Sequence, residues 1–158
     1  MVSSSLTIWV DADATPREVK ELILRAGQRL QASVVLVANS GQRIPHGFPT
    51  ARAVVVPGGP DMADKHIAEH AGAGDVSITA DIPLAAALVE KRVYVIDPRG
   101  HEYTPQNVGE RLSVRDFMDE LRQSGVETSG PRPYRPQDRQ AFAQALDRVL
   151  TRAARPRP

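Results

Sequence analysis

The sequence predicts a three-layer α/β/α fold in which helices cover both faces of a central parallel sheet of five strands. Short apolar runs rich in β-branched residues recur along the chain, and stretches with helical apolar spacing stand between most of them. Strands that alternate with helices in this way pair in parallel, because each crossover helix returns the chain to the same end of the sheet. At 158 residues the chain suits one domain, which we expect to span residues 1–158.

The first strand and the first helix have the clearest local signals. Residues 6–10 form a short apolar run bounded by polar residues, which is typical of a buried strand. Thr15 can cap the following helix, with Pro16 at its first position and Glu18 placed to complete a capping box. We therefore expect a helix over residues 16–30, with an apolar stripe that packs on the sheet.

The rest of the chain continues the alternation up to a long polar segment. We expect strands at 33–38, 53–56, 76–79 and 93–96, and helices at 60–71, 82–91 and 137–152. Residues 101–112 are polar and longer than a typical loop, so we expect an irregular, functional segment there. Ser113 then resembles the start of a capping box, opening a helix whose side chains Val114, Phe117, Met118 and Leu121 should point inward.

Composition and charge limit the possible functions. The chain has no cysteine, which excludes disulfides, zinc–thiolate sites and a thiol nucleophile. No apolar run approaches the length of a membrane span, and Met1 to Ser5 lack the features of a signal peptide, so we expect a cytoplasmic protein with no membrane partner.

The C-terminal residues 130–158 are expected to form a proline-broken linker, a helix and a basic tail. The net charge of the whole chain is +1, yet this segment holds seven arginines against the two acids Asp138 and Asp147. The arginines are residues 132, 135, 139, 148, 152, 155 and 157. Two interpretations stay open, a solvated helix face with a basic tail or a surface that contacts phosphates.

Aspartates recur where predicted strands give way to helices. Asp11 and Asp13 follow the first strand, Asp81 follows the fourth, and Asp61 and Asp64 stand three residues apart in the first turn of the helix over 60–71. Each alone could be a helix cap, but the carboxyl ends of parallel strands meet at one edge of the sheet, where ligands bind. Two carboxylates about 4 Å apart repel by roughly 4 kcal/mol at an effective dielectric constant of 20, so such a cluster calls for protons or a cation.

Oxygen ligands without cysteine favour magnesium or manganese. We therefore predict all five aspartates as metal ligands, with Asp11, Asp64 and Asp81 as the catalytic group. Polar and cationic residues near the same edge or in the long polar segment are candidates for substrate binding: Asn39, Arg43, Arg99 and Arg111.

Three functions from different classes fit these residues. A metal at the aspartates could polarise a phosphate and activate water for phosphodiester hydrolysis, with RNA as the expected substrate. The letters from Asp11 to Thr15 also match the DxDxT opening of haloacid-dehalogenase-like phosphatases, in which Asp11 would be the phosphoryl-accepting nucleophile. Thr79 could supply a later residue of that pattern, while neither Lys65 nor Lys91 matches its lysine well. A binding module that only coordinates a metal or nucleic acid is the third possibility.

Several stretches of the chain resemble the YaiI/YqxD family of bacterial proteins, which is itself similar to the PIN-like nucleases. The resemblance lies in residues 9–14 (WVDADA), 61–67 (DMADKHI), 78–85 (ITADIPLA) and 98–100 (PRG), and it extends through shorter stretches to Arg139. It implies a PIN-like sheet with strand order 3-2-1-4-5 and acidic metal positions at Asp11, Asp64 and Asp81. The family usually has cysteine at position 15, so the threonine here makes the phosphatase match look accidental.

Overall fold

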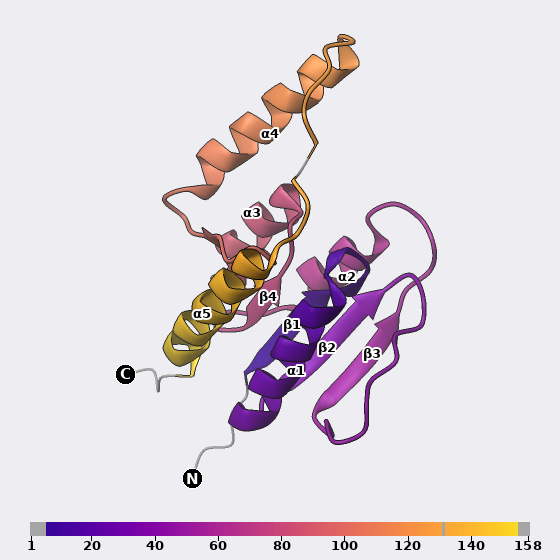
Figure 1. The fold of residues 1–158 in the computed structure, drawn as a ribbon, viewed down its shortest axis with the longest axis vertical. Helices are drawn as coiled ribbons and strands as arrows, with labels where there is room; N and C mark the ends of the chain where they lie inside the picture. Colours follow the sequence, from indigo (N-terminus) through magenta and orange to yellow (C-terminus); the bar gives the residue numbers. More distant parts are fainter. Residues whose placement is uncertain (1–5, 131, 155–158) are drawn as a thin grey trace.

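The centre of the fold is a six-stranded sheet with strand order β3-β2-β1-β4-β5-β6 (Figure 1). The structure, a computed structural model, describes residues 6–130 and 132–154. The expectations for Met1 to Ser5, Pro131, Arg155 and Arg157 lie outside the described residues. The strands are β1 (Thr7–Asp11), β2 (Ser33–Ala38), β3 (Ala51–Val55), β4 (Val76–Ile78), β5 (Tyr94–Ile96) and β6 (Glu102–Tyr103). The first five are parallel in the order that the family resemblance implies.

The sixth strand corrects the predicted count of five. β6 pairs antiparallel with β5 at the edge of the sheet, with Val95 opposite Tyr103. The expectation that residues 101–112 are irregular is therefore wrong at this point. A turn makes the pairing possible, because the Asp97 carboxylate accepts hydrogen bonds from the backbone N–H groups of Arg99 and His101 and so reverses the chain.

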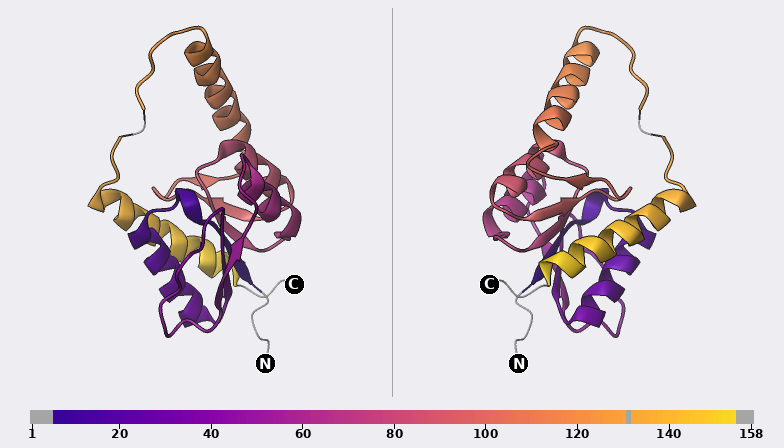
Figure 2. Two further views of the ribbon diagram at one scale, coloured as in Figure 1. Left: turned by 90° about the vertical axis from the view of Figure 1, so that its right-hand side faces the viewer. Right: turned by 90° about the vertical axis from the view of Figure 1, so that its left-hand side faces the viewer.

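Helices cover both faces of the sheet and confirm the three-layer α/β/α class. One face packs against α1 (Arg17–Leu30) and α5 (Pro136–Ala153), and the other against α2 (Met62–His70) and α3 (Ile82–Glu90). Alternation along β1 explains this division, because Ile8 and Val10 point into the first layer while Trp9 points into the second. Figure 2 shows α5 running beside α1 on the face opposite to α3.

The predicted cap of α1 is wrong, although the helix itself is found. After β1 the chain makes a short 3₁₀ turn over Ala12–Ala14, and α1 begins at Arg17 with Pro16 at the cap position. The Thr15 hydroxyl donates to the Asp11 carbonyl oxygen at 2.7 Å, so it is not available to cap α1. The turn brings Thr15 next to the end of β1, which explains why Thr15 does not cap α1 as predicted.

The helix α4 (Val108–Gln123) begins five residues before the predicted start at Ser113. Its start is set by Thr104 and Asn107, whose side chains accept hydrogen bonds from each other's backbone N–H groups at 2.9 and 3.2 Å. The expectation that its apolar side chains point inward is also wrong, since Val114 is 55% exposed and Phe117 58%. Figures 1 and 2 show the reason: α4 lies against α3 at its first turns and then projects beyond the three layers.

The helix α5 (Pro136–Ala153) confirms the helix predicted over residues 137–152. It packs on the sheet through Phe142 and Leu146. Among residues 6–130 and 132–154, no helix is long and apolar enough to cross a membrane.

Candidate functional site

Five aspartates line one cavity at the carboxyl ends of β1, β2 and β4. The cavity has a volume of about 370 Å³, and Asn39 and the backbone around Gly59 and Ala80 complete its wall. The aspartates are Asp11, Asp13, Asp61, Asp64 and Asp81. The structure therefore brings together every aspartate that the sequence singled out, because parallel strands end at the same edge.

Asp11 is the most buried of the five, with 8% of its surface exposed. It is the last residue of β1, and its Oδ2 atom accepts a long hydrogen bond of 3.4 Å from the Thr79 hydroxyl. Burial raises the pKa of Asp11, as do the charges of Asp81 and Asp13, and the bond from Thr79 opposes this shift. The carboxylate is thus held in place without a cationic partner.

Asp64 carries the largest shift among the aspartates of the cavity. Burial, the charges of Asp81 and Asp11, and a side-chain hydrogen bond with Asp81 raise its pKa to about 7. With a pKa of about 7, the Asp64 carboxyl group is partly protonated near neutral pH, and this proton offsets part of the crowded negative charge.

Asp81 is both a helix cap and a member of the cluster. Its Oδ1 atom accepts a hydrogen bond from the backbone N–H of Leu84 at 2.8 Å, which caps α3. Its own backbone N–H donates to the Thr79 hydroxyl at 3.0 Å. The capping role fixes the carboxyl group at the cavity wall, so the two interpretations of this residue are compatible.

Thr79 connects Asp11 and Asp81, and the sequence indicated it only for the phosphatase pattern. It is 1% exposed at the end of β4, and its hydroxyl bonds to the Asp11 carboxylate and the Asp81 backbone. The sequence could have indicated Thr79, because it is a hydroxyl residue two positions before Asp81 at the end of a predicted strand. Only the pairing of β4 beside β1 shows which groups it joins.

Asp13 and Asp61 lie at the outer rim of the cavity. The Asp13 carboxylate accepts hydrogen bonds from the Asn39 backbone N–H at 2.7 Å and from the Ser40 hydroxyl at 3.4 Å, which ties the ends of β1 and β2 together. Asp61 precedes α2 with a left-handed backbone conformation, φ 64°, which costs free energy for any residue with a Cβ. Both side chains belong to exposed residues.

The cavity has the ligand chemistry of a magnesium or manganese site but not a completed ligand set. Its carboxylates and its Asn39 side chain are oxygen donors of the type these cations prefer. Across residues 6–130 and 132–154, however, no three His, Asp or Glu side chains are placed so that they could hold a metal ion as they stand. A cation would have to displace the proton that Asp64 partly retains at neutral pH.

The predicted substrate-binding arginines lie at three different places. The Arg99 guanidinium donates to Asp138 at 2.9 Å and to the Arg132 carbonyl oxygen, and it lies over the Tyr134 ring, so it joins the linker to α5. Arg43 is exposed in the segment between β2 and β3. Arg111 lies 5.3 Å from the centre of the Tyr103 ring and faces a separate cavity beside α4.

Two cations that were not among the predicted site residues lie beside the aspartates. Lys65 and Arg115 line a second hollow of about 310 Å³, whose wall also includes Asp61, Asp64 and Asp81. Lys65 is in α2 next to Asp64, a local signal that was available. Arg115 belongs to α4, and only the packing of α4 on α3 brings it here.

Comparison with known proteins places the chain in a family. A family model described as "Uncharacterized BCR, YaiI/YqxD family" matches residues 9–152. This chain belongs to the YaiI/YqxD family. The matched residues include the whole acidic cavity, so the cavity lies within the family's shared domain.

Curated relatives match this YaiI/YqxD chain over nearly their full length. A "UPF0178 protein" of Myxococcus xanthus is 55% identical over 153 residues, covering 97% of this chain and 99% of the relative. "UPF0178 protein Bpet3884" of Bordetella petrii is 52% identical over 148 residues, covering 94% and 98%. A "UPF0178 protein" of Acidithiobacillus ferrooxidans is 52% identical over 146 residues, covering 92% and 99%.

Proposed function

We propose that this YaiI/YqxD protein is a PIN-like, magnesium- or manganese-dependent phosphodiester hydrolase that acts on RNA. The observation that carries the proposal is the convergence of Asp11, Asp64 and Asp81 in one cavity, with the pKa of Asp64 raised to about 7. Carboxylates that crowd until one keeps its proton at neutral pH form a site in which a divalent cation would relieve the repulsion.

Asp11, Asp64 and Asp81 would hold the cation, with Asp13 and Asp61 at the rim. The bound cation would supply Lewis-acid polarisation of a phosphate and a lower pKa for a coordinated water. Thr79 positions the carboxylate of Asp11 and the backbone of Asp81. Lys65 and Arg115, which line the adjoining hollow, would bind phosphate oxygens and offset the charge of the substrate.

The ionisation of Asp64 is coupled to the binding of a cation. Without one, the pKa of Asp64 is about 7, so its carboxyl group is partly protonated at neutral pH. When a cation binds the cluster, its charge would lower the pKa of Asp64 and favour the ionised form. The pH dependence of activity should therefore differ between low and saturating metal.

A phosphatase that uses Asp11 remains the second candidate, because the Thr79 hydroxyl bonds to that carboxylate. Lys65 lines the adjoining hollow, whose wall does not include Asp11. Lys91 is engaged elsewhere, since its ammonium group donates to the Ala68 carbonyl oxygen. The Asp13 carboxylate, which would be the acid/base in this mechanism, is bound to the backbone of Asn39.

The experiment that separates these functions compares two substrates, two variants of the cavity and one control variant. Wild-type protein with manganese is incubated with a labelled single-stranded RNA and, separately, with p-nitrophenyl phosphate. We expect RNA cleavage that is lost in Asp11→Asn and Asp81→Asn and is kept in Asp147→Asn, whose side chain is exposed on α5. Monoester hydrolysis with a phosphoryl adduct on Asp11 by intact mass would instead establish the phosphatase. Neither activity would favour the non-catalytic binding module.

A further inference from the structure

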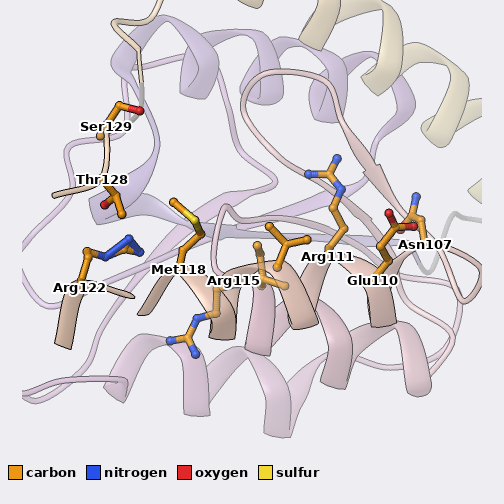
Figure 3. A pocket seen from close by; sticks show the side chains of 11 residues that line it. Asn107, Glu110, Arg111, Arg115, Met118, Arg122, Thr128 and Ser129 are labelled. Atoms are coloured by element: carbon orange, nitrogen blue, oxygen red, sulfur yellow. The ribbon is translucent and has the colours of Figure 1, made fainter. Parts of the chain in front are cut away.

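A cavity along α4 shares Arg115 with the hollow beside the aspartates. It has a volume of about 750 Å³ and lies between α4 and the returning segment at Thr128, Ser129 and Gly130 (Figure 3). We call this hollow the α4 groove. Its charged lining residues are Arg111, Arg115, Arg122 and Glu110, a formal charge of +2.

The α4 groove leads to the aspartates through Arg115. This residue lines both the groove and the hollow that contains Asp61, Asp64 and Asp81. Figure 3 shows the guanidinium groups of Arg111 and Arg115 pointing in different directions from α4. Arg111 turns toward Tyr103, while Arg115 lies within the electrostatic reach of Asp81. A bound chain could therefore follow the groove and pass Arg115 to the carboxylates.

Two arginines of the groove, Arg115 and Arg122, form exposed ion pairs within α4. Arg115 pairs with Asp116 and Asp119, and Arg122 pairs with Asp119. Exposed pairs of this kind contribute little free energy and are easily exchanged for another anion. Neither Asp116 nor Asp119 lines the groove, so a phosphate in it would meet the cations first.

Apolar side chains stand beside the cations. Val114 and Met118 line the groove, and Phe117 is exposed on the same helix. None of the residues of α4 is buried, although the helix has apolar residues through its length. The groove therefore offers cations for phosphates and apolar surface for unstacked bases, and the aromatic ring of Phe117 is exposed on the same helix.

We propose that the α4 groove binds a single-stranded polynucleotide and delivers it past Arg115 to the aspartate cavity. The proposal rests on the proposed hydrolase function, which it extends with a substrate path. Charge complementarity selects the occupant, because the arginines of the groove attract the phosphates of a polyanion. The aspartates repel phosphates, so a phosphate can approach them only where a cation is bound.

Binding is tested apart from cleavage, by fluorescence anisotropy with a labelled oligouridylate in EDTA, where turnover does not compete. We expect Arg115→Ala/Arg122→Ala to weaken binding at least tenfold. The slope of log K against log salt should fall by about 0.7 for each phosphate that no longer pairs with an arginine. The matched control is Arg17→Ala on α1, where the side chain is 92% exposed and pairs with Glu21. It should bind like the wild type, and thermal melts should show that both variants are folded.

Three results would refute the proposal that the α4 groove binds a single strand. They are wild-type protein that does not bind the oligonucleotide saturably, a double variant with unchanged affinity and salt slope, or an Arg17→Ala control that weakens binding as much. A deoxy oligonucleotide of the same sequence shows whether the groove distinguishes RNA from DNA, and binding of either supports it.

A further step distinguishes failure of the groove proposal from failure of the hydrolase proposal. Manganese is then added to the wild type and to the double variant. Binding that depends on the arginines without any cleavage would contradict the hydrolase and leave the groove as a binding surface. Cleavage that is unchanged in the double variant would contradict the groove and leave the hydrolase.

Discussion

Replacing Asp64 by asparagine should stabilise the metal-free protein at neutral and higher pH. In the folded protein the pKa of Asp64 is about 7, against 3.8 for the unperturbed group. Between these values the folded state holds a proton that the unfolded state has released, so the free energy of unfolding falls as the pH rises from about 4 to about 7. The asparagine side chain cannot ionise, so it removes this contribution.

The magnitude follows from the size of the shift. The interval from 3.8 to about 7 spans about 3 pH units, which at about 1.4 kcal/mol per unit would be about 4 kcal/mol. Asp64 is only partly buried, and solvent screens its interactions, so we expect about 2 kcal/mol. For a chain of this size that corresponds to a rise of about 4 to 8 °C in Tm at pH 8.

The assay is urea and thermal unfolding in EDTA at pH 5 and pH 8. The wild type should lose stability between these values, and Asp64→Asn should lose less. Asp147→Asn is the control, since its carboxylate is 70% exposed and pairs with Arg29 far from the cavity. If the wild type and Asp64→Asn lose the same free energy between pH 5 and pH 8, the carboxylates do not repel as described and the cavity needs no cation.

Three further predictions concern the same molecule. Manganese at a hundredfold excess over its dissociation constant should stabilise the wild type at pH 7 by about 2.7 kcal/mol in thermal melts; an equal effect in Asp11→Asn/Asp81→Asn would show that the aspartates do not bind it. Asp61→Gly should be more stable than Asp61→Ala by about 1 kcal/mol in urea unfolding, because both remove the charge but only glycine adopts the left-handed backbone without a steric cost; equal stabilities would contradict this. Asp138 accepts bonds from Arg99, Arg132 and the Arg135 backbone, and the bond from Arg132 first of all lowers its pKa to about 2. Stability from this carboxylate should therefore be lost as the pH falls from about 4 to about 2, and an acid titration of Asp138→Asn should lack that loss.

The sequence by itself determined the layers and the location of the aspartates. Successive side chains along β1 and β2 point to opposite faces of the sheet. Because the residues on both faces are apolar, each face must be covered by a layer of helices. The strand-to-helix junctions then place Asp11 and Asp81 at the carboxyl edge, because in parallel strands that edge is the same for all. These are local patterns, and the period of the backbone converts them directly into position.

Only the tertiary structure decided what those aspartates do to each other and which cations lie beside them. The raised pKa of Asp64 depends on its burial and on how closely α2 approaches α3, which no local pattern encodes. Arg99 looked like a free cation in a turn but pairs with Asp138, 39 residues further along the chain. The apolar positions of α4 predicted a buried helix, yet the helix projects from the body and Arg115 meets the aspartates. Periodicity shows which side of a helix is apolar, while the contacts between distant segments decide whether anything covers it.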